Sequence, residues 1–154
     1  MEHTAQRYEA ICDASPDAIL LVDDEGIITY ANARVDDMLG YDPVDLVGTP
    51  IERLVPEPVR EGHVAERNAY IADPETRPMG VGLDLSARCA DGSTVPVDIS
   101  LSPIAGDGET AVMAAVRDVS DRTALQKTYR TILAAVPDPV LIADAETGEI
   151  VEAN

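Results

Sequence analysis

The sequence contains no phenylalanine and no tryptophan, and its only aromatic residues are five tyrosines. A hydrophobic core must therefore be built from Val, Ile, Leu and Ala, which are among the residue types most often buried. With 154 residues, 45% of them hydrophobic, the chain can form one such core but not two. We expect one complete domain and at most a fragment of a second.

Basic residues are also scarce. The chain has 11 Lys and Arg, with Lys127 as the only lysine, against 29 Asp and Glu, and its formal net charge is −18. Such a charge repels nucleic acid and anionic membranes, so neither is an expected partner. The acids are spread between apolar runs, which is typical of a solvated surface. The Asp-rich, Lys-poor composition indicates a halophilic protein, because concentrated salt would screen this self-repulsion.

The sequence lacks a long apolar run and a metal-binding cysteine cluster. No segment reaches the ~18 apolar residues of a membrane span, and Met1-Glu2-His3 leads into polar sequence, not into a signal peptide. We therefore expect a cytoplasmic location without direct membrane insertion. Cys12 and Cys89 stand far apart with no CxxC motif, so we expect buried free thiols and no metal site.

Catalytic motifs are absent as well. The sequence has no Walker loop, HExxH motif, nucleophile elbow or Ser/His/Asp grouping. Paired acids such as Asp23-Asp24 and Asp36-Asp37 fall on an expected turn or exposed helix, where they serve solvation. We therefore expect no catalytic residues and no enzyme activity in this chain, although a parent protein could carry a histidine kinase domain elsewhere.

An internal repeat divides the chain. Residues 8–23 read YEAICDASPDAILLVD and residues 129–144 read YRTILAAVPDPVLIAD, in register throughout. After one inserted residue, Ala31-Asn32 matches Ala153-Asn154. We expect four segments: a lead helix at 1–15, a domain at 16–120, a linker helix at 121–136, and the truncated start of a second domain at 137–154.

Hydrophobic periodicity predicts the elements of the domain. A continuous apolar run and a turn ending in Gly26 predict a hairpin, and Asn32 is expected to cap a short helix that ends at Gly40. Further helices and three alternating strands follow. The predicted helices are 43–46, 50–54 and 58–71, and the predicted strands are 18–22, 27–31, 81–89, 95–101 and 111–119.

Beyond Ser120, apolar residues recur at the heptad spacing of Leu125, Tyr129, Ile132 and Val136. Two arrangements stay open. The helix could lie on its own domain, or it could pair with a second copy in a parallel coil.

This order of elements resembles the PAS fold. The motifs that carry the resemblance are Pro16-Asp17, Tyr30-Ala31-Asn32, Leu39-Gly40-Tyr41, Asp91-Gly92-Ser93 and residues 116–120, which are similar to the closing Asp-x-Ser/Thr signature. The resemblance covers residues 8–122 and restarts at 129–154. It implies an α+β fold: a five-stranded antiparallel sheet in the order 2-1-5-4-3, helices on one face, flanking terminal helices and a small pocket.

The resemblance implies a sensory or signal-relay module of a two-component or other multi-domain signalling protein. An unidentified small ligand would bias the exit helix, and a downstream histidine kinase, transducer or regulator would read that bias. The residues expected to carry the output are Asp118, Ser120, Leu125 and Tyr129. An alternative is a ligand-free module that forms a homodimer through its flanking helices.

His63 is the candidate cofactor ligand. The segment from Val55 to His63 is similar to the haem-binding PAS domains of rhizobial oxygen-sensing kinases, whose histidine at this place is the proximal iron ligand. At the positions near the propionates and on the distal side this chain has Ala69, Arg77 and Leu83, of which only Arg77 is charged. A haem-based gas or redox sensor is therefore a further alternative.

Other ligands are also open. Asn68 is followed by Ala69 and not by the cysteine that flavin photoreceptors need, so flavin is not expected. Arg67, Arg77 or Arg88 could bind a carboxylate or aromatic metabolite, or could form surface ion pairs. The sequence leaves open which ligand binds.

Overall fold

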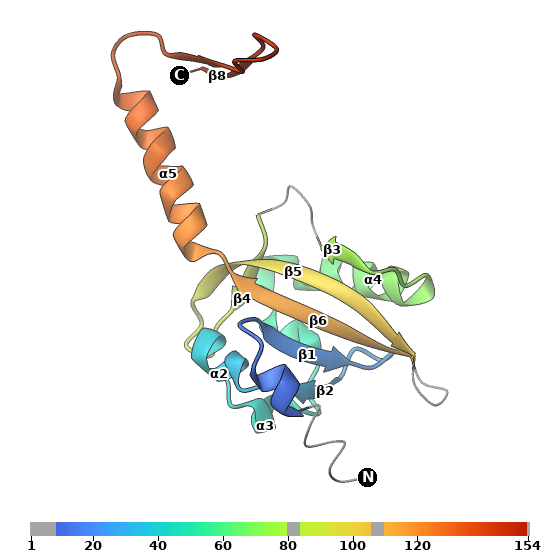
Figure 1. Ribbon diagram of the computed structural model, residues 1–154. Coiled ribbons are helices and arrows are strands. Elements are labelled where there is room, and N and C mark those ends of the chain that lie inside the picture. The colour runs from blue at the N-terminus through green and yellow to red at the C-terminus, as the bar shows by residue number, and fades with distance from the viewer. Residues whose placement is uncertain (1–8, 80–83, 106–109, 154) are drawn as a thin grey trace. The chain divides into compact units, whose positions relative to one another are not determined.

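The computed structural model describes residues 9–79, 84–105 and 110–153, which fall into two compact units that divide between Val119 and Ser120 (Figure 1). The predictions that involve His3, Tyr8, Val81, Leu83 and Asn154 lie outside the described residues.

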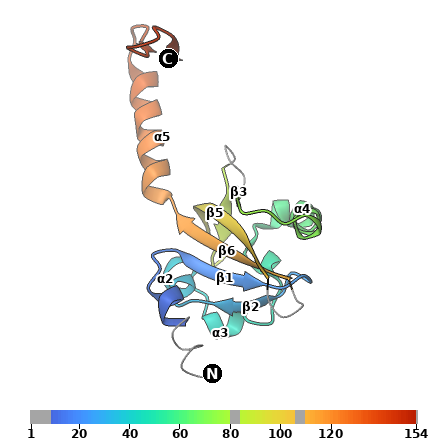
Figure 2. The ribbon, with the colours of Figure 1, turned by 45° about the vertical axis from the view of Figure 1, so that its right-hand side comes forward.

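The first unit is built on one antiparallel sheet. Its strands run in the order β2-β1-β6-β5-β3, and β4 also pairs with β5. The long strands β5 and β6 lie side by side in both views (Figures 1 and 2). The strands are β1 (Ala18–Val22), β2 (Ile28–Ala31), β3 (Arg77–Met79), β4 (Ser86–Arg88), β5 (Thr94–Ala105) and β6 (Thr110–Asp118). This order confirms the α+β sheet expected from the resemblance.

The third expected strand differs from its prediction. Instead of one strand over 81–89, two short strands pair with different parts of β5: Arg77 lies opposite Leu101, and Ser86 lies opposite Pro96. Among the described residues between them, Asp84 and Leu85 belong to neither strand. The alternation of apolar residues predicted a strand in this region but not its break.

The core is mostly aliphatic, as predicted, but the prediction was incomplete, because the ring of Tyr41 also belongs to it. In β1 the side chains of Ala18, Ile19, Leu20 and Val22 are all buried, which explains the continuous apolar run. A single cluster joins β1, β5 and β6 to the helices that follow the hairpin. These helices are α2 (Arg34–Leu39), α3 (Pro43–Leu46), η1 (Ile51–Leu54), η2 (Glu57–Val59) and α4 (Arg60–Ala72).

Helix ends follow local chemistry. Gly40 ends α2 with φ of 72°, a left-handed conformation that glycine adopts without strain, as predicted. Asp42 caps α3 through a bond from the Val44 amide. The helix predicted from Pro58 instead begins at Arg60, and Pro58 lies in the short η2 segment before it.

Asn32 has a different role from the predicted cap. No side-chain bond caps α2, whose N-cap is Ala33. The Asn32 Oδ1 atom accepts the Ile19 amide at 2.9 Å, and Nδ2 donates to the carbonyls of Cys12 at 2.7 Å and Asp17 at 3.1 Å. The side chain is buried, so its amide bonds to the backbone of β1 and of the lead helix instead of facing the start of α2.

The second unit repeats the start of the first. It contains α5 (Ser120–Ala135), β7 (Leu141–Ala143) and β8 (Ile150–Ala153). The register of β1 with β2 shifts between Leu21 and Val22, and that of β7 with β8 shifts at the corresponding place, between Ile142 and Ala143. The two copies of the repeat therefore form hairpins with the same irregularity.

The cysteines and the helices were expected to be buried thiols and non-membrane segments, respectively. Cys12 and Cys89 are free thiols, but each is half-buried and not fully buried as expected. Within the described residues, no helix combines the length and apolar character needed to cross a membrane.

An ion pair joins the two ends of the first unit. Arg117, near the end of β6, donates from Nε to Asp17 Oδ1 at 2.8 Å and from a terminal nitrogen to Oδ2 at 2.9 Å. Asp17 precedes β1, so this bidentate pair fixes the start of β1 to the end of β6. The pair lies next to the point where the chain leaves the sheet for α5.

We predict that this pair makes the stability of the first unit fall at low pH. The hydrogen bonds and charge of Arg117 hold the pKa of Asp17 below its ordinary value of 3.8, against a smaller opposing effect of burial. A carboxyl group with a lowered folded-state pKa stabilises the fold above its unfolded-state pKa, and this contribution is lost as pH falls through the folded-state pKa. The free energy of unfolding of Arg117→Gln should lie below that of the wild type at pH 7, and the difference should disappear as pH falls from about 4 to 2.

The control for this measurement is Arg88→Gln, which removes the same charge from a residue with no carboxylate partner among the described residues. A difference between Arg117→Gln and wild type that does not change with pH would contradict the prediction.

Candidate functional site

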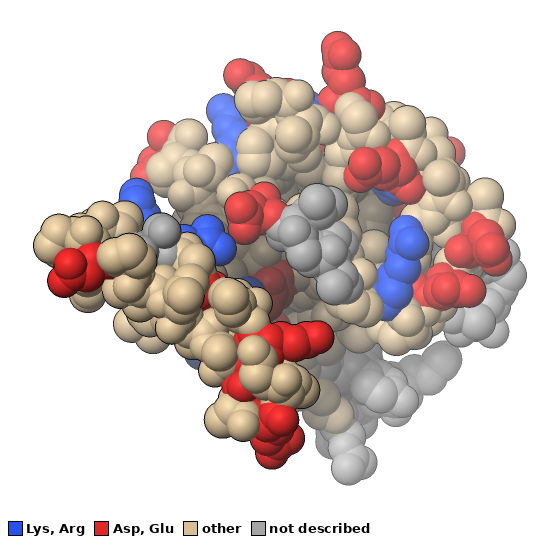
Figure 3. All heavy atoms as spheres, turned by 90° about the horizontal axis from the view of Figure 1, so that it is seen from above, with Lys and Arg blue, Asp and Glu red and all other residues tan. Residues whose placement is uncertain are grey.

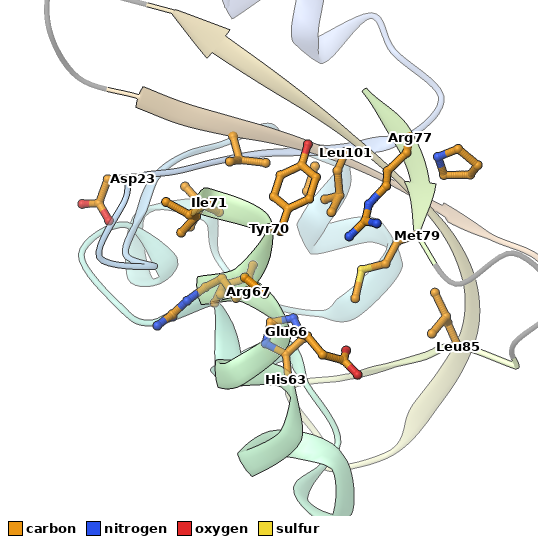
Figure 4. A pocket seen from close by; sticks show the side chains of 16 residues that line it. Asp23, His63, Glu66, Arg67, Tyr70, Ile71, Arg77, Met79, Leu85 and Leu101 are labelled. Carbon is orange, nitrogen blue, oxygen red and sulfur yellow. The ribbon is translucent and has the colours of Figure 1, made fainter. Parts of the chain in front are cut away.

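A pocket of about 480 Å³ lies between α4 and the sheet (Figure 4). Its sheet side is apolar and is formed by Val22, Leu101, Val112 and Ala114. The α4 side carries polar groups. A preformed, mostly apolar pocket of this size with a few polar groups is typical of a site for a small ligand. The other lining residues are Asp23, Ile51, His63, Glu66, Arg67, Ala69, Tyr70, Ile71, Arg77, Pro78, Met79 and Leu85.

A buried carboxylate, Glu52 of η1, organises the polar side of the pocket. Only 8% of the residue is exposed. Arg67 donates to its two oxygens at 2.8 and 2.9 Å, and His63 Nδ1 lies 3.1 Å from Oε1. His63 and Arg67 are one turn apart on α4, so both reach the same acid. Glu52 therefore fixes α4 to η1 by a pair that is largely shielded from water.

The β1–β2 turn joins this cluster. The Ile51 amide donates to the carbonyl of Gly26 at 2.9 Å. Gly26 has φ of 87°, and a Cβ atom there would lie 1.7 Å from an Arg67 nitrogen. A side chain at position 26 would therefore displace Arg67 from Glu52 in addition to straining the backbone. The turn, η1 and α4 meet at this one place.

The opposite edge of the pocket contains a cation over an aromatic ring. The Arg77 guanidinium carbon lies 5.1 Å from the centroid of the Tyr70 ring, within the range of a cation–π contact. Tyr70 is buried, and its hydroxyl donates to the carbonyl of Glu75. Burial raises the pKa of Tyr70, so the phenol stays neutral at physiological pH. Figure 4 shows Arg77 reaching from β3 toward Tyr70.

The structure brings together three of the residues singled out from the sequence: His63, Arg67 and Arg77 all line the pocket. Arg88 lies on β4 and does not line it. Glu52 was missed, because one acid in a short helix carries no sequence signal until its partners on α4 are known.

The residues expected to carry the output lie at the exit from the sheet. Asp118 ends β6 and Ser120 begins α5. Leu125 and Tyr129 are exposed on α5. Burial and the neighbouring Glu152 carboxylate raise the pKa of Tyr129.

The donor set agrees with haem in part. Because Nδ1 of His63 lies beside a carboxylate, its Nε2 would be the metal-binding atom, and a carboxylate partner of this kind is typical of metal-ligating histidines. Arg77 could pair with a propionate, whereas Arg67 already pairs with Glu52 and Ala69 has no charge. In the described part of the chain, no group of three or more His, Cys, Asp or Glu is placed to hold a metal ion.

Acidic side chains are spread over the protein surface without forming a block (Figure 3). In the face shown in Figure 3, Asp and Glu are scattered between uncharged residues and outnumber Lys and Arg. Long-range attraction of an anion by this surface is therefore weak, and any anion specificity must come from local contacts.

Comparisons with known proteins agree with this architecture. The chain is 26% identical over 117 residues to the sensor protein FixL of Bradyrhizobium diazoefficiens, covering 76% of this chain and 23% of that protein. It is 25% identical over 138 residues to the oxygen sensor protein DosP of Escherichia coli, covering 88% of this chain and 17% of that protein. The chain thus spans less than a quarter of the length of either relative.

Solved structures of PAS domains have a similar fold. The PAS domain of an HTR-like protein from Haloarcula marismortui has a TM-score of 0.62 and 28% identity, with 77% of this chain and 93% of that chain covered. A PAS domain from Colwellia psychrerythraea has a TM-score of 0.63 and 22% identity, covering 78% and 99%. The profile described as PAS fold matches residues 6–119, and a second, described as PAS domain, matches residues 127–154. The chain belongs to the PAS fold family.

Proposed function

We propose that the first unit senses a small ligand bound between α4 and the sheet, and that β6 carries the bound state into α5. The observation that supports this proposal best is the pocket itself, with an apolar wall from the sheet and polar groups from α4 and β3. Such a site can bury the body of a small ligand and orient it through a few polar contacts.

Strand β6 is the proposed route of the signal. Val112 and Ala114 line the pocket, and the same strand ends at Asp118, immediately before α5 begins at Ser120. The Arg117–Asp17 pair ties the end of this strand to the start of β1. A ligand that moves β6 would therefore shift the start of α5, by an amount set by its differential affinity for the two states.

The proposed output is the apolar stripe of α5. Leu125, Tyr129 and Ile132 are all exposed, as expected of a surface that a second copy would cover in a homodimer. We propose that residues 137–154 begin a second PAS domain and that a downstream module, such as a histidine kinase, reads the state of α5. A ligand-free relay through the same dimer is the alternative.

A haem-based sensor is a second candidate. It is supported by the place of His63 in the pocket wall beside Glu52 and by the likeness to DosP, which is an oxygen sensor protein. Haem would supply reversible binding of a gas or a redox change. His63 would hold the iron of the haem, and Arg77 would pair with a carboxylate of the group.

We predict that a bulky side chain on β6 that fills the pocket weakens ligand binding. The probe is N-phenyl-1-naphthylamine, a neutral dye whose fluorescence rises in an apolar site. Ala114→Phe places a bulky ring in the pocket and should weaken dye binding at least about tenfold. Ala115→Phe is the matched control, because the next residue on a strand points to the opposite face. Equal dye affinities for wild type and Ala114→Phe, with both variants folded, would contradict the proposal.

The haem candidate predicts that haemin added to the purified chain gives a protein-bound Soret band, sharper than that of free haemin and shifted from it in wavelength. The band should persist in His3→Ala and be lost in His63→Ala, because these are the two histidines of the sequence. A wild-type protein that binds the dye but leaves the Soret band of haemin as in the free compound would exclude haem and leave the small-ligand proposal in place.

A further inference from the structure

We infer that the pocket selects an amphipathic carboxylate, with an apolar body against the sheet and its carboxylate on Arg77. This inference rests on the proposed function, since it names the chemical class of the ligand for the same pocket.

Arg77 is the arginine of the pocket whose N–H donors are available to an anionic ligand. Arg67 is paired with the two oxygens of Glu52. Among the described residues, no carboxylate lies within ion-pair distance of Arg77. A guanidinium at the edge of an apolar pocket, with no acid beside it, has its N–H donors available to a ligand carboxylate.

The Tyr70 ring holds this guanidinium in place. A guanidinium that lies over a ring at this distance can keep N–H groups directed away from the ring for bidentate bonds. Tyr70 is itself fixed by burial and by its bond to the Glu75 carbonyl. Less conformational entropy is therefore lost when a carboxylate binds Arg77 than with an unsupported surface arginine.

The remaining acids of the pocket do not oppose this assignment. The Oδ1 atom of Asp23 accepts the amides of Glu25 and Ile27 at 3.0 and 2.8 Å, so its charge is stabilised within the turn. Glu66 and Arg77 are both exposed, so water screens the charge of each, and selection of a carboxylate must come from direct hydrogen bonds to Arg77. The apolar side chains of Val22, Leu101 and Val112 then favour a hydrocarbon or aromatic body next to a single anionic end.

Two sources supply this chemistry: a metal-free organic acid, such as a fatty or aromatic acid, and a haem propionate. Both place a carboxylate on Arg77. Only haem also needs His63, so the two sources differ in their dependence on that residue.

The test is displacement of the bound dye from the full chain by decanoate and by decanol, which share a body and differ in the acid. The assay is run at about 1 M KCl, where long-range repulsion by the acidic surface is screened within ~3 Å. Wild type should bind decanoate more tightly than decanol. Arg77→Gln should weaken decanoate about tenfold while changing decanol less than about twofold. Arg77→Lys should recover part of the loss.

The matched control is Arg53→Gln. The guanidinium carbon of Arg53 lies 5.3 Å from the centroid of the Tyr41 ring, close to the 5.1 Å between Arg77 and Tyr70, but Arg53 does not line the pocket. Its decanoate affinity should equal that of wild type. Melting temperatures of both variants check that folding is unchanged.

The possible results distinguish a failure of the carboxylate inference from a failure of the proposed function. Dye binding with equal affinity for decanoate and decanol, or equal losses in Arg53→Gln and Arg77→Gln, would overturn the inference and leave the proposed function standing. Failure of the wild type to bind the dye would overturn both. If haemin displaces the dye, and if both Arg77→Gln and His63→Ala weaken haemin binding, the result would support the inference with a haem propionate as the carboxylate.

Discussion

The buried carboxylate of Glu52 is the contact on which the architecture of the site depends. Both of its oxygens accept hydrogen bonds from Arg67, and Oε1 lies beside His63 Nδ1. One acid therefore holds two successive turns of α4. Arg67 in turn packs over Gly26 in the β1–β2 turn. A charge in this position is stable only while its partners remain, because an unpaired buried charge is costly. The cluster thus makes η1, α4 and the turn into one wall.

This constraint bears on the proposed transmission of a signal from the pocket to α5. A wall fixed at one end lets the pocket keep its shape before a ligand arrives, which lowers the ordering cost of binding. The opposite wall includes Val112 and Ala114 of β6, the strand that leads to α5. With α4 held by Glu52, the movement that a ligand produces would fall on the sheet and on the Arg117–Asp17 pair at its end. A fixed α4 wall and a movable sheet agree with the proposal that ligand binding is transmitted through β6 to α5.

Much of this fold could be predicted from local sequence. The apolar run of β1, the left-handed glycine at position 40 and the repeated hairpin all follow from rules that act within a few residues. The bonds of Asn32 and Glu52 could not be predicted, since their partners are 11 to 20 residues away and depend on tertiary packing. His63, Arg67 and Arg77 were found as chemistry-bearing residues, but only the structure separates the paired Arg67 from the available Arg77.

Hydrogen exchange of the α4 amides measures the central claim most directly. The comparison is between wild type, Glu52→Gln and the exposed control Glu57→Gln, at one pH and salt concentration. If Glu52 fixes α4, Glu52→Gln should speed exchange in residues 60–72 about tenfold or more, while β1 and β6 keep their protection and Glu57→Gln behaves as wild type. Unchanged protection of α4, or an equal loss across the whole sheet, would contradict the account.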